Sequence, residues 1–570
     1  MKNENMEKAF AEDEAYETMQ SANICSVHFF SKDPENKGIS YIHNSRDHST
    51  KAKGTLQMYD KDFVLQYEGD VDALKGRGNT TWDGSITDKR SYQVKLDKKA
   101  DLLDPASGEQ KAKKWILLAN PFDPTLIRNS MFYAFGREIG LETTPEGIPV
   151  DFYYDGEYRG SYYLCEKVEI GKGRVDINDL ESDIEDANAN VDMEELQEIQ
   201  ELDSQGYERK YEDGIANPAD ISGGYLLEMD LIYYHNEKSW FFFGPTQIAV
   251  SKSPEYLSKE MTDYISGYMT RTYDYAYDES HKFTRGKNIF DYIDKETFVK
   301  YWFVNEWFAN NDVWTSSTFV YKPQGDERLY AGPVWDCDST MQIKDEVADT
   351  NQWFTQGFGS YLQRLPAFRE ALQEIYKSDI RPVIYDVLLG TEEGRYLKPA
   401  TEMEQEIADS LAMNYMIWDI NDCIGAYHPK DTVEANYEAM TSWMQNRAKW
   451  VDDQIMDKDF AKNKIIVRKT TKVKLKKNAK KRTCRVTFAK TKYILNNSVR
   501  TTPKYATKYQ VAYKTSKAKK WKKATTAKRS YTIKKMKKGK TYKIKVRAVV
   551  KYNGKTYYGP WSKIRKARVK

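Results

Sequence analysis

The sequence predicts a mixed α+β body followed by a separate all-β module. Segments with strand-type alternation dominate up to about Pro254, and segments with helical spacing dominate from there to about residue 457. From Asn463 to Lys570 the strand pattern returns, and this stretch holds 39 Lys or Arg residues and no Asp or Glu. A chain of 570 residues is long enough for two to four domains of roughly 100–200 residues each.

Charge is distributed unevenly along the chain. The formal net charge of +3 combines the basic stretch 463–570 with a body that holds the other 49 basic residues and all 85 acidic ones. Many cations without anions favour polyanionic partners, and such binding weakens steeply with salt. An anionic cell-wall polymer or an acidic protein is therefore the expected partner of this stretch. Nucleic acid is the weaker alternative, because no pattern of base-stacking aromatic residues is evident.

Targeting and cysteine patterns leave the compartment open. No run of about 18 apolar residues predicts a membrane-spanning helix. Residues 1–22 read as a polar helix or leader without the apolar centre of a signal peptide. The cysteines show neither zinc-type spacing nor a disulfide framework; they are Cys25, Cys165, Cys337, Cys423 and Cys484.

The first half of the body is expected to be rich in strands. Residues 63–67 and 91–96 alternate in the period-2 way. Residues 150–170 read as two strands joined at Asp155-Gly156, a pair typical of tight hairpin turns. Another strand is predicted at 222–231, after a Gly-Gly turn.

An acidic insertion interrupts these strands at residues 181–214, with 13 acidic and two basic residues. Within it, residues 193–202 have helical spacing of Leu196, Ile199 and Leu202, which predicts a solvated helix. A calcium site is the alternative, although the spacing of the acids matches no known calcium-binding loop.

The second half of the body is expected to be helical. Residues 295–310 carry apolar side chains at i, i+3, i+4 and i+7, and residues 366–415 and 433–456 show the same pattern. A short strand is predicted at 317–322. The Met and Trp residues of the last helix suit a core better than a ligand site.

A Gly-Arg-Gly turn followed by a strand with lysines at its edges is the first candidate binding element. Gly76 and Gly78 permit close approach of the backbone to a ligand. Arg77, Lys89 and Lys95 carry charge that suits phosphate groups. Taken alone the motif is weak, because such turns are common and exposed strand lysines are usually solvated.

Charged residues also stand in strands that are otherwise apolar. Glu166 and Lys167 end one such strand, and Glu228 lies in another. A Lys–Glu ion pair that positions nucleotide phosphates is one physical reason to keep such charges. Which glutamate pairs with a lysine stays open. Asp123, by contrast, reads as a structural cap of the apolar helix that follows it.

Two aspartates one residue apart, Asp336 and Asp338, follow an apolar Pro-Val-Trp run. A third, Asp312, lies 24 residues before Asp336, with a strand–turn–strand between them. Phosphoryl-transfer enzymes of the kinase type use one Asp for the acceptor hydroxyl and a second, past a hairpin, for Mg²⁺. The alternative is that these acids are hydrated at the end of a strand.

Six stretches occur in an order that resembles the CotH kinase family, the spore coat protein H type. They are "GRGNTTW…KRSYQVKL", "RNSMFYAFGREIGL", "GEYRGSYYLCEKVEI", "GGYLLEMD", "NNDVW" and "PVWDCDST", and the resemblance runs from about residue 60 to 455. It implies an atypical protein-kinase-like fold over residues 23–457, with a β-rich N-lobe at about 23–253 and a helical C-lobe at about 254–457. It also implies ATP and a divalent cation, Mg²⁺ or Mn²⁺, as cofactors.

The resemblance assigns roles to particular residues. Asp312 matches the catalytic-loop Asp of the family, Asp336 its metal-binding Asp, and Asp338 the second acid of its Trp-Asp-x-Asp motif. Ser317 stands at a metal-ligand position where many members have Asn. The family keeps phosphate-binding or strand charges at five further positions, which are Arg77, Lys89, Lys95, Glu166 and Glu228.

Residues 463–570 resemble a fibronectin type III domain, an immunoglobulin-like sandwich. The matching residues are Tyr509 and Val511, the corner with Tyr542, and the closing Gly-Pro-Trp-Ser at 559–562. A seven-stranded sandwich of ~100 residues fits this length.

The expected function is transfer of phosphate from ATP to Ser or Thr of secreted or surface proteins. The alternative is a non-catalytic surface or adhesion protein, in which the kinase-like body is a scaffold and the basic sandwich binds polyanions. Ser317 in place of Asn supports the alternative. By resemblance, the protein is expected outside the cell or on the surface of a bacterium.

Overall fold

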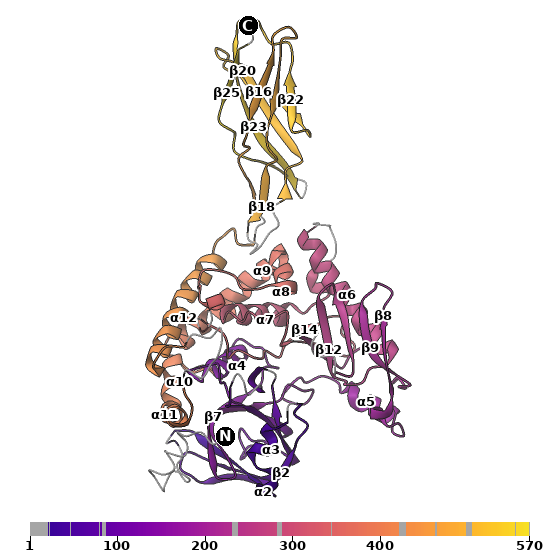
Figure 1. Cartoon of the computed structure of the whole chain (residues 1–570), viewed down its shortest axis with the longest axis vertical. Helices are drawn as coiled ribbons and strands as arrows, with labels where there is room; N and C mark the ends of the chain where they lie inside the picture. Colours follow the sequence, from indigo (N-terminus) through magenta and orange to yellow (C-terminus); the bar gives the residue numbers. More distant parts are fainter. Residues whose placement is uncertain are drawn as a thin grey trace. The chain divides into compact units, whose positions relative to one another are not determined.

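The structure is a computed structural model, and it describes residues 21–568 except 22, 46, 79, 83–86, 231–236, 282–287, 342, 344, 421–428, 462–463, 497–503 and 553–554. Within these residues the fold is mixed α+β, as predicted (Figure 1). The chain divides into two compact units, the first formed by nearly all residues up to Asp457 and the second mainly by Lys458–Lys570. This division falls where the charge of the sequence changes sign. The predicted leader lies outside the described residues, apart from Ser21.

The first unit contains a closed barrel of seven strands, in the order β1-β2-β3-β4-β5-β7-β6. Strands β1 and β6 run parallel, and all other neighbours are antiparallel. The hairpin predicted over residues 150–170 is β6–β7, and Asp155 and Gly156 form its turn at φ 50° and 84°. The strands are β1 (Cys25–Ser31), β2 (Ala52–Tyr59), β3 (Leu65–Arg77), β4 (Ser91–Ala100), β5 (Ala112–Leu118), β6 (Gly147–Tyr154) and β7 (Glu157–Glu166).

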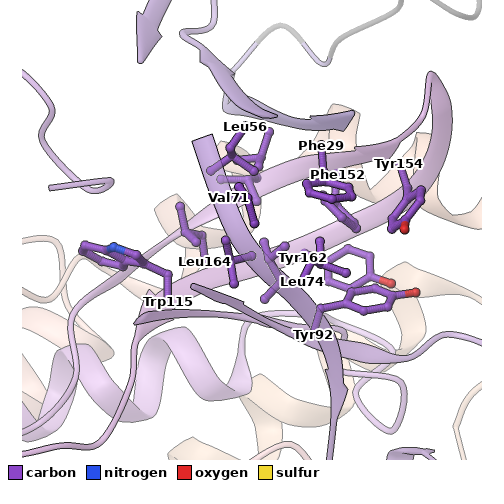
Figure 2. Close-up of a cluster of buried hydrophobic side chains, with 14 of the residues drawn as sticks. Phe29, Leu56, Val71, Leu74, Tyr92, Trp115, Phe152, Tyr154, Tyr162 and Leu164 are labelled. Carbon is purple, nitrogen blue, oxygen red and sulfur yellow. The ribbon is translucent and has the colours of Figure 1, made fainter. Parts of the chain in front are cut away.

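The barrel interior is filled by apolar side chains from alternate strand positions. Figure 2 shows part of this cluster, in which Leu56, Val71 and Leu74 lie near the rings of Phe152 and Tyr162. Burying one large apolar side chain contributes roughly 1.5–3 kcal/mol. The barrel is therefore a rigid base for the strand ends that leave it, including the end of β3 at Arg77.

A second, seven-stranded sheet has the order β14-β13-β10-β12-β11-β9-β8. Its strands are β8 (Gln197–Leu202), β9 (Glu208–Asp213), β10 (Tyr225–Asp230), β11 (Trp240–Gly244), β12 (Gln247–Ser253), β13 (Thr318–Lys322) and β14 (Tyr330–Ala331). Strand β13, predicted within the C-lobe, pairs directly with β10, predicted within the N-lobe. The expected lobe division at 253/254 therefore runs through one sheet.

The prediction of a helix over residues 193–202 is wrong. A single 3₁₀ turn, Met193–Glu195, is followed by strand β8, which pairs with β9. Glu198 and Glu201 on β8 form ion pairs of 2.8 Å and 2.6 Å with Lys210 and Arg209 on β9. Cross-strand charge pairs and the sheet edge thus outweigh the helical spacing of three apolar residues.

Helices cover both β elements of the first unit. They are α2 (Pro34–Lys37), α3 (Ile39–His43), α4 (Arg128–Glu138), α5 (Leu180–Ala187), α6 (Lys259–His281), α7 (Lys295–Trp307), α8 (Gly357–Arg364), α9 (Pro366–Ile375), α10 (Ala400–Glu406), α11 (Ala408–Ile417) and α12 (Val433–Ile455). Helical structure is confirmed in the three segments predicted for the second half of the body. No described helix combines the length and the apolar character needed to cross a membrane.

Helices α4 and α7 join the barrel to the second sheet. Helix α4 contacts β6 of the barrel, and α7 contacts both α4 and β14. The rings of Phe132 and Phe135 on α4 pack edge-on against Phe308, with centroids 5.2 Å and 5.6 Å apart. The segments that follow α7 and β14 are therefore held between the two β elements.

The second unit is built of β-strands around its own apolar cluster. Its sheets have the orders β15-β18-β19, β16-β17-β22 and β21-β20-β23-β24, and β25 also pairs with β23. The hydroxyl of Tyr542 accepts a hydrogen bond of 3.0 Å from the backbone N–H of Lys537, the contact of a tyrosine corner. The strands are β15 (Lys464–Val467), β16 (Lys474–Asn478), β17 (Thr483–Thr487), β18 (Lys492–Asn496), β19 (Lys504–Tyr505), β20 (Lys508–Thr515), β21 (Lys522–Thr526), β22 (Ser530–Ile533), β23 (Thr541–Tyr552), β24 (Lys555–Tyr558) and β25 (Arg565–Arg568).

Candidate functional site

A cleft of about 540 Å³ in the first unit collects residues from β3, β10, β12, the turn after α7 and the segment after β14. This volume is in the range of ligand-binding pockets. Six of the nine residues to which the family resemblance assigned a role or a charge line it, and they are Arg77, Glu228, Asp312, Ser317, Asp336 and Asp338. Residues up to 261 positions apart in sequence thus meet at one place.

The loop that carries Asp336 and Asp338 is fixed through its backbone. Asn129 Oδ1 accepts a 2.8 Å hydrogen bond from the N–H of Cys337, and Arg128 Nε donates a 3.2 Å hydrogen bond to the carbonyl of Thr340. The side chain of Asp336 is exposed in the cleft, whereas Asp338 is only 8% exposed. The backbone that carries the two aspartates is therefore held in place beside the cleft.

Asp123 supports this loop from the start of α4. Its carboxylate accepts hydrogen bonds from the backbone N–H groups of Thr125 (2.9 Å) and Arg128 (2.8 Å), and it is ion-paired with the fully buried Arg128 side chain. The N-cap residue of α4 is Ile127, so Asp123 is not the cap that was predicted, although its carboxylate accepts the first N–H of the helix from a position five residues earlier. Through Arg128, the same aspartate also holds the segment after Asp338.

Asn310 connects Asp312 to Asp336. Its Oδ1 accepts a 3.2 Å hydrogen bond from the N–H of Asp312, and its Nδ2 donates a 3.1 Å hydrogen bond to the carbonyl of Asp336. The carbonyl of Asp312 in turn accepts hydrogen bonds from the N–H groups of Thr315 and Ser316, at 3.1 Å and 2.9 Å. The two acidic loops are therefore parts of one hydrogen-bonded arrangement.

Ser317, which directly precedes β13, belongs to the same hydrogen-bonded arrangement. Its hydroxyl donates a 3.3 Å hydrogen bond to Oδ2 of Asp336. Ser317 and Asp336 both lie in the left-handed region, at φ 50° and 63°, and so do Ala309, Trp314 and Met341 nearby. Such conformations cost free energy and persist where surrounding contacts impose them, which is common at functional sites.

Glu228 is the predicted glutamate that lies beside a lysine in the cleft. Lys252 Nζ is 3.6 Å from Glu228 Oε2 and 2.9 Å from Glu237 Oε1. A bulge in the β10–β12 pairing, between Leu226 and Leu227, leaves Lys252 opposite no single residue. The sequence did not single out Lys252 or Glu237, because only the sheet brings them to Glu228.

Burial and mutual attraction govern the charges of this group. Burial raises the pKa of Glu228, and Lys252 opposes that rise. Burial by itself lowers the pKa of Lys252, but the Glu228 and Glu237 carboxylates outweigh it and raise this pKa. Lys252 is therefore held as an ammonium in the cleft, where it can meet anionic groups of a ligand.

Arg77 and Lys75 on β3 bring further positive charge to the cleft. The guanidinium carbon of Arg77 lies 5.1 Å from the centroid of Trp335, and Tyr133 is stacked on the same ring at 5.7 Å. Burial, followed by repulsion from Lys51 and other cations, lowers the pKa of Lys75. Lys75 was missed in the sequence, although its spacing of two from Arg77 on one strand could have indicated it.

Gly76 and Gly78 of the turn are required for different structural reasons. A Cβ at Gly76 would lie 2.1 Å from the ring of Trp82, so this glycine allows an internal contact. Gly78 has φ 98°, a conformation that L side chains rarely adopt. Both glycines line the cleft.

The other three residues assigned by the family resemblance, Lys89, Lys95 and Glu166, are not among those that line the cleft. Lys89 is buried and donates a 2.7 Å hydrogen bond to the carbonyl of Ser161. Lys95 forms a 3.0 Å ion pair with Asp72. Glu166 is buried near Arg174 (3.5 Å) and Arg137 (3.8 Å), and burial raises its pKa. Lys89, Lys95 and Glu166 therefore make structural contacts outside the cleft.

The donor set of the cleft fits a divalent cation that is held together with phosphate. In the part of the chain that the structure describes, no group of three or more His, Cys, Asp or Glu could hold a metal ion by itself. Mg²⁺ is commonly bound by one or two carboxylates plus substrate phosphates. Asp336 and Asp338, with the hydroxyl of Ser317, supply such a partial set beside the basic residues.

A family model described as "CotH kinase protein" matches residues 74–451 of the chain. The chain belongs to the CotH kinase family. All six cleft residues singled out above lie within the matched segment, and the family resemblance seen in the sequence is confirmed. Membership in the CotH kinase family implies an atypical protein kinase that uses ATP and acts on protein.

Other comparisons add no functional argument. No curated protein matches the chain. A solved structure titled "Myokine structure" is 11% identical, with a TM-score of 0.14, and the match covers 18% of this chain and 96% of the other. One titled "Titin kinase and its flanking domains" is 14% identical, with a TM-score of 0.13, and the match covers 18% and 17%. The fibronectin type III resemblance of residues 463–570 lies outside the CotH match and stays a prediction.

Proposed function

We propose that the first unit transfers the γ-phosphoryl group of ATP to a Ser or Thr hydroxyl of a secreted or cell-surface protein. The observation that carries this proposal is the hydrogen-bonded arrangement of Asp312, Asn310 and Asp336 in one cleft with basic side chains. The module at 463–570, proposed as a fibronectin type III-like sandwich, is not needed for this chemistry. Its strands form a unit with a separate apolar cluster.

Each cleft residue has a role that follows from its position. Asp312 accepts the proton of the acceptor hydroxyl. The oxygen of that hydroxyl forms a bond to the γ-phosphorus of ATP, and the bond between this phosphorus and the oxygen that leaves with ADP breaks. Lys252, held by Glu228 and Glu237, and Arg77 attract the phosphate groups. Mg²⁺ or Mn²⁺, held by Asp336, Asp338 and Ser317, would neutralise charge on the phosphates.

The first prediction is that ATP with Mg²⁺ or Mn²⁺ stabilises the first unit. Ligand at about 100 times its Kd adds roughly 2.7 kcal/mol to the free energy of unfolding. Asp336→Asn should abolish this gain, because the amide lacks the charge that holds the metal. Asn is chosen because Asp336 has φ 63°, which Asn tolerates and Ala does not. Thermal unfolding of the full chain, with and without nucleotide and metal, measures the gain.

A matched control is Asp409→Asn, at an exposed position of α11 outside the cleft, which should keep the whole gain. Asp312→Asn should also keep nucleotide binding but lose transfer of labelled phosphate to protein. Binding without transfer in the unmodified chain would favour the non-catalytic surface scaffold, which Ser317 in place of Asn also favours. No stabilisation with either metal would contradict the nucleotide site itself.

A further inference from the structure

The second unit carries a row of alternating cationic and aromatic side chains on one face of its five-stranded sheet. Lys545 Nζ lies 4.5 Å from the ring centroid of Trp521 and 4.6 Å from that of Trp561. The guanidinium carbon of Arg547 lies 4.4 Å from Trp561 and 3.9 Å from Tyr558. These five side chains are called the cation ladder below.

Strand alternation places the ladder on the outer side of the sheet. On β23, Lys545 and Arg547 alternate with the buried residues Ile544, Val546 and Ala548. Two residues along a strand span about 6.6–6.8 Å, so the two cations keep a fixed spacing. The ladder therefore presents two cations at a fixed spacing on the outer side of the sheet.

Further cations border the ladder on the same face. Lys523 of β21 and Lys545 of β23 both lie opposite Ala512 of β20. Gln510 lies opposite Arg547 and accepts a 3.0 Å hydrogen bond from its Nε. That bond fixes the guanidinium while its terminal nitrogens stay available for an anion. Lys514 adds another ammonium 5.2 Å from Trp521.

No anion of the module neutralises this charge. The stretch 463–570 contains no Asp or Glu, so aromatic rings take the place that carboxylates have in ordinary surface ion pairs. Burial, and then repulsion from Arg547, Lys523 and Lys514, lowers the pKa of Lys545. The cations of the ladder thus repel one another and would be stabilised by an external anion.

We infer that the cation ladder binds an extended phosphodiester polymer without bases, of the anionic cell-wall type. The ladder supplies two cations at a fixed spacing, and the bordering Lys514 and Lys523 supply additional charge on the same face. The inference does not depend on the proposed kinase activity, because every residue that carries it lies in the second unit.

Two alternatives fit the ladder less well. A specific protein interface is usually depleted of Lys, and electrostatic specificity for a protein needs complementary charge of both signs. A single-stranded nucleic acid needs aromatic faces on which bases can stack. Here the ring of Trp561 is in contact with Lys545 and Arg547, and the ring of Trp521 is in contact with Lys545 and Lys514. These contacts compete with the stacking of bases on the two rings.

The test measures binding of the full chain to poly(glycerol phosphate) over a range of salt concentrations. Lys545→Gln/Arg547→Gln should weaken binding about 25-fold at 0.1 M salt, taking about 0.7 released counterions per phosphate contact. The slope of log K against log salt should become shallower by about 1.4. The control Lys476→Gln/Lys480→Gln removes the same charge from exposed positions on β16 and in the turn that follows it, in a hairpin of another sheet of the second unit. It should leave the slope unchanged.

Four results would overturn the inference. One is absence of binding at low salt, and another is an equal loss of affinity in the control variant, which would show a response to net charge alone. The third is equal or tighter binding of poly-glutamate, which would indicate an acidic protein partner. The fourth is tighter binding of single-stranded DNA of matched charge. Unfolding of each variant in denaturant checks that the second unit remains folded.

Discussion

Replacement of Arg447 by Met is expected to destabilise the first unit by about 3–5 kcal/mol at pH 8, because it leaves a buried carboxylate without its partner. Arg447 on α12 has no exposed surface, and its Nη2 donates a 3.0 Å hydrogen bond to Oε1 of Glu306 on α7. Glu306 is 3% exposed and accepts further hydrogen bonds from the N–H groups of Phe354 and Thr355, at 2.6 Å and 2.8 Å. Denaturant unfolding measures the loss.

The loss should depend on pH in a defined direction. Burial raises the pKa of Glu306, and Arg447 opposes that rise. Without the arginine the pKa rises further, so the folded variant binds a proton that the unfolded chain has released. The variant therefore loses stability as pH increases, and its deficit relative to the unmodified protein should be smaller at pH 5 than at pH 8.

Two further variants separate the ion pair from other causes. Lys449→Met removes a cation from the exposed face of the same helix and should change stability by no more than about 0.5 kcal/mol. Arg447→Met/Glu306→Gln should recover part of the loss, because the remaining side chain is neutral. A loss in Arg447→Met below 1 kcal/mol, or one that does not change with pH, would contradict this account.

This ion pair also supports the candidate site. Arg447 Nη2 donates a 2.7 Å hydrogen bond to the backbone carbonyl of Glu306, one residue before the end of α7. The chain then turns through Ala309, at φ 58°, to Asn310 and Asp312. Fixing the end of α7 fixes the start of the loop that carries Asp312.

The acidic residues of the site could be predicted because the chain order of short motifs was informative. Asp312 and Asp336 lie in loops after an apolar helix and a short strand, and the sequence shows both elements. The basic residues were predicted less accurately, since Arg77 lines the cleft but Lys89 and Lys95 do not. Lys95 was proposed because it stands in the strand after the Gly-Arg-Gly turn and matches a basic position of the family, but it lies opposite Ala73 and is ion-paired with Asp72.

Long-range pairing decides the remaining differences. Lys252 meets Glu228 because β12 pairs with β10 across a bulge, and neither the pairing nor the bulge has a local signal in the sequence. Likewise β13 joins the second sheet, although it lies in the half of the body whose sequence is mainly helical. Local patterns identify elements, but which strands become neighbours depends on packing of the whole unit.

Acidification from pH 6.5 to pH 4 is expected to cost the first unit about 3 kcal/mol through His28 alone, at 1.36 kcal/mol for each unit of pKa shift. His28 on β1 is 7% exposed, its ring is stacked 4.3 Å from that of Tyr153, and Nε2 is 3.0 Å from the hydroxyl of Ser26. Burial lowers the pKa of His28 from 6.5 to about 4.

The direction of the effect follows from proton binding. Between pH 6.5 and pH 4 the unfolded chain binds a proton at His28 that the folded chain does not, so stability is full above pH 6.5 and falls towards pH 4. His28→Phe keeps an aromatic ring beside Tyr153 and removes the titrating group. The free energy of unfolding of this variant, from urea titrations at each pH, should therefore decline by about 3 kcal/mol less.

Other titrating groups cancel in this comparison. Burial also lowers the pKa of His43, but that residue is present in both proteins and contributes equally to both curves. The difference between the two proteins should therefore change only between pH 6.5 and pH 4 and be constant above that range. Parallel curves over the whole range would show that His28 titrates with an ordinary pKa, and that the stacked ring is open to protonation in the folded barrel.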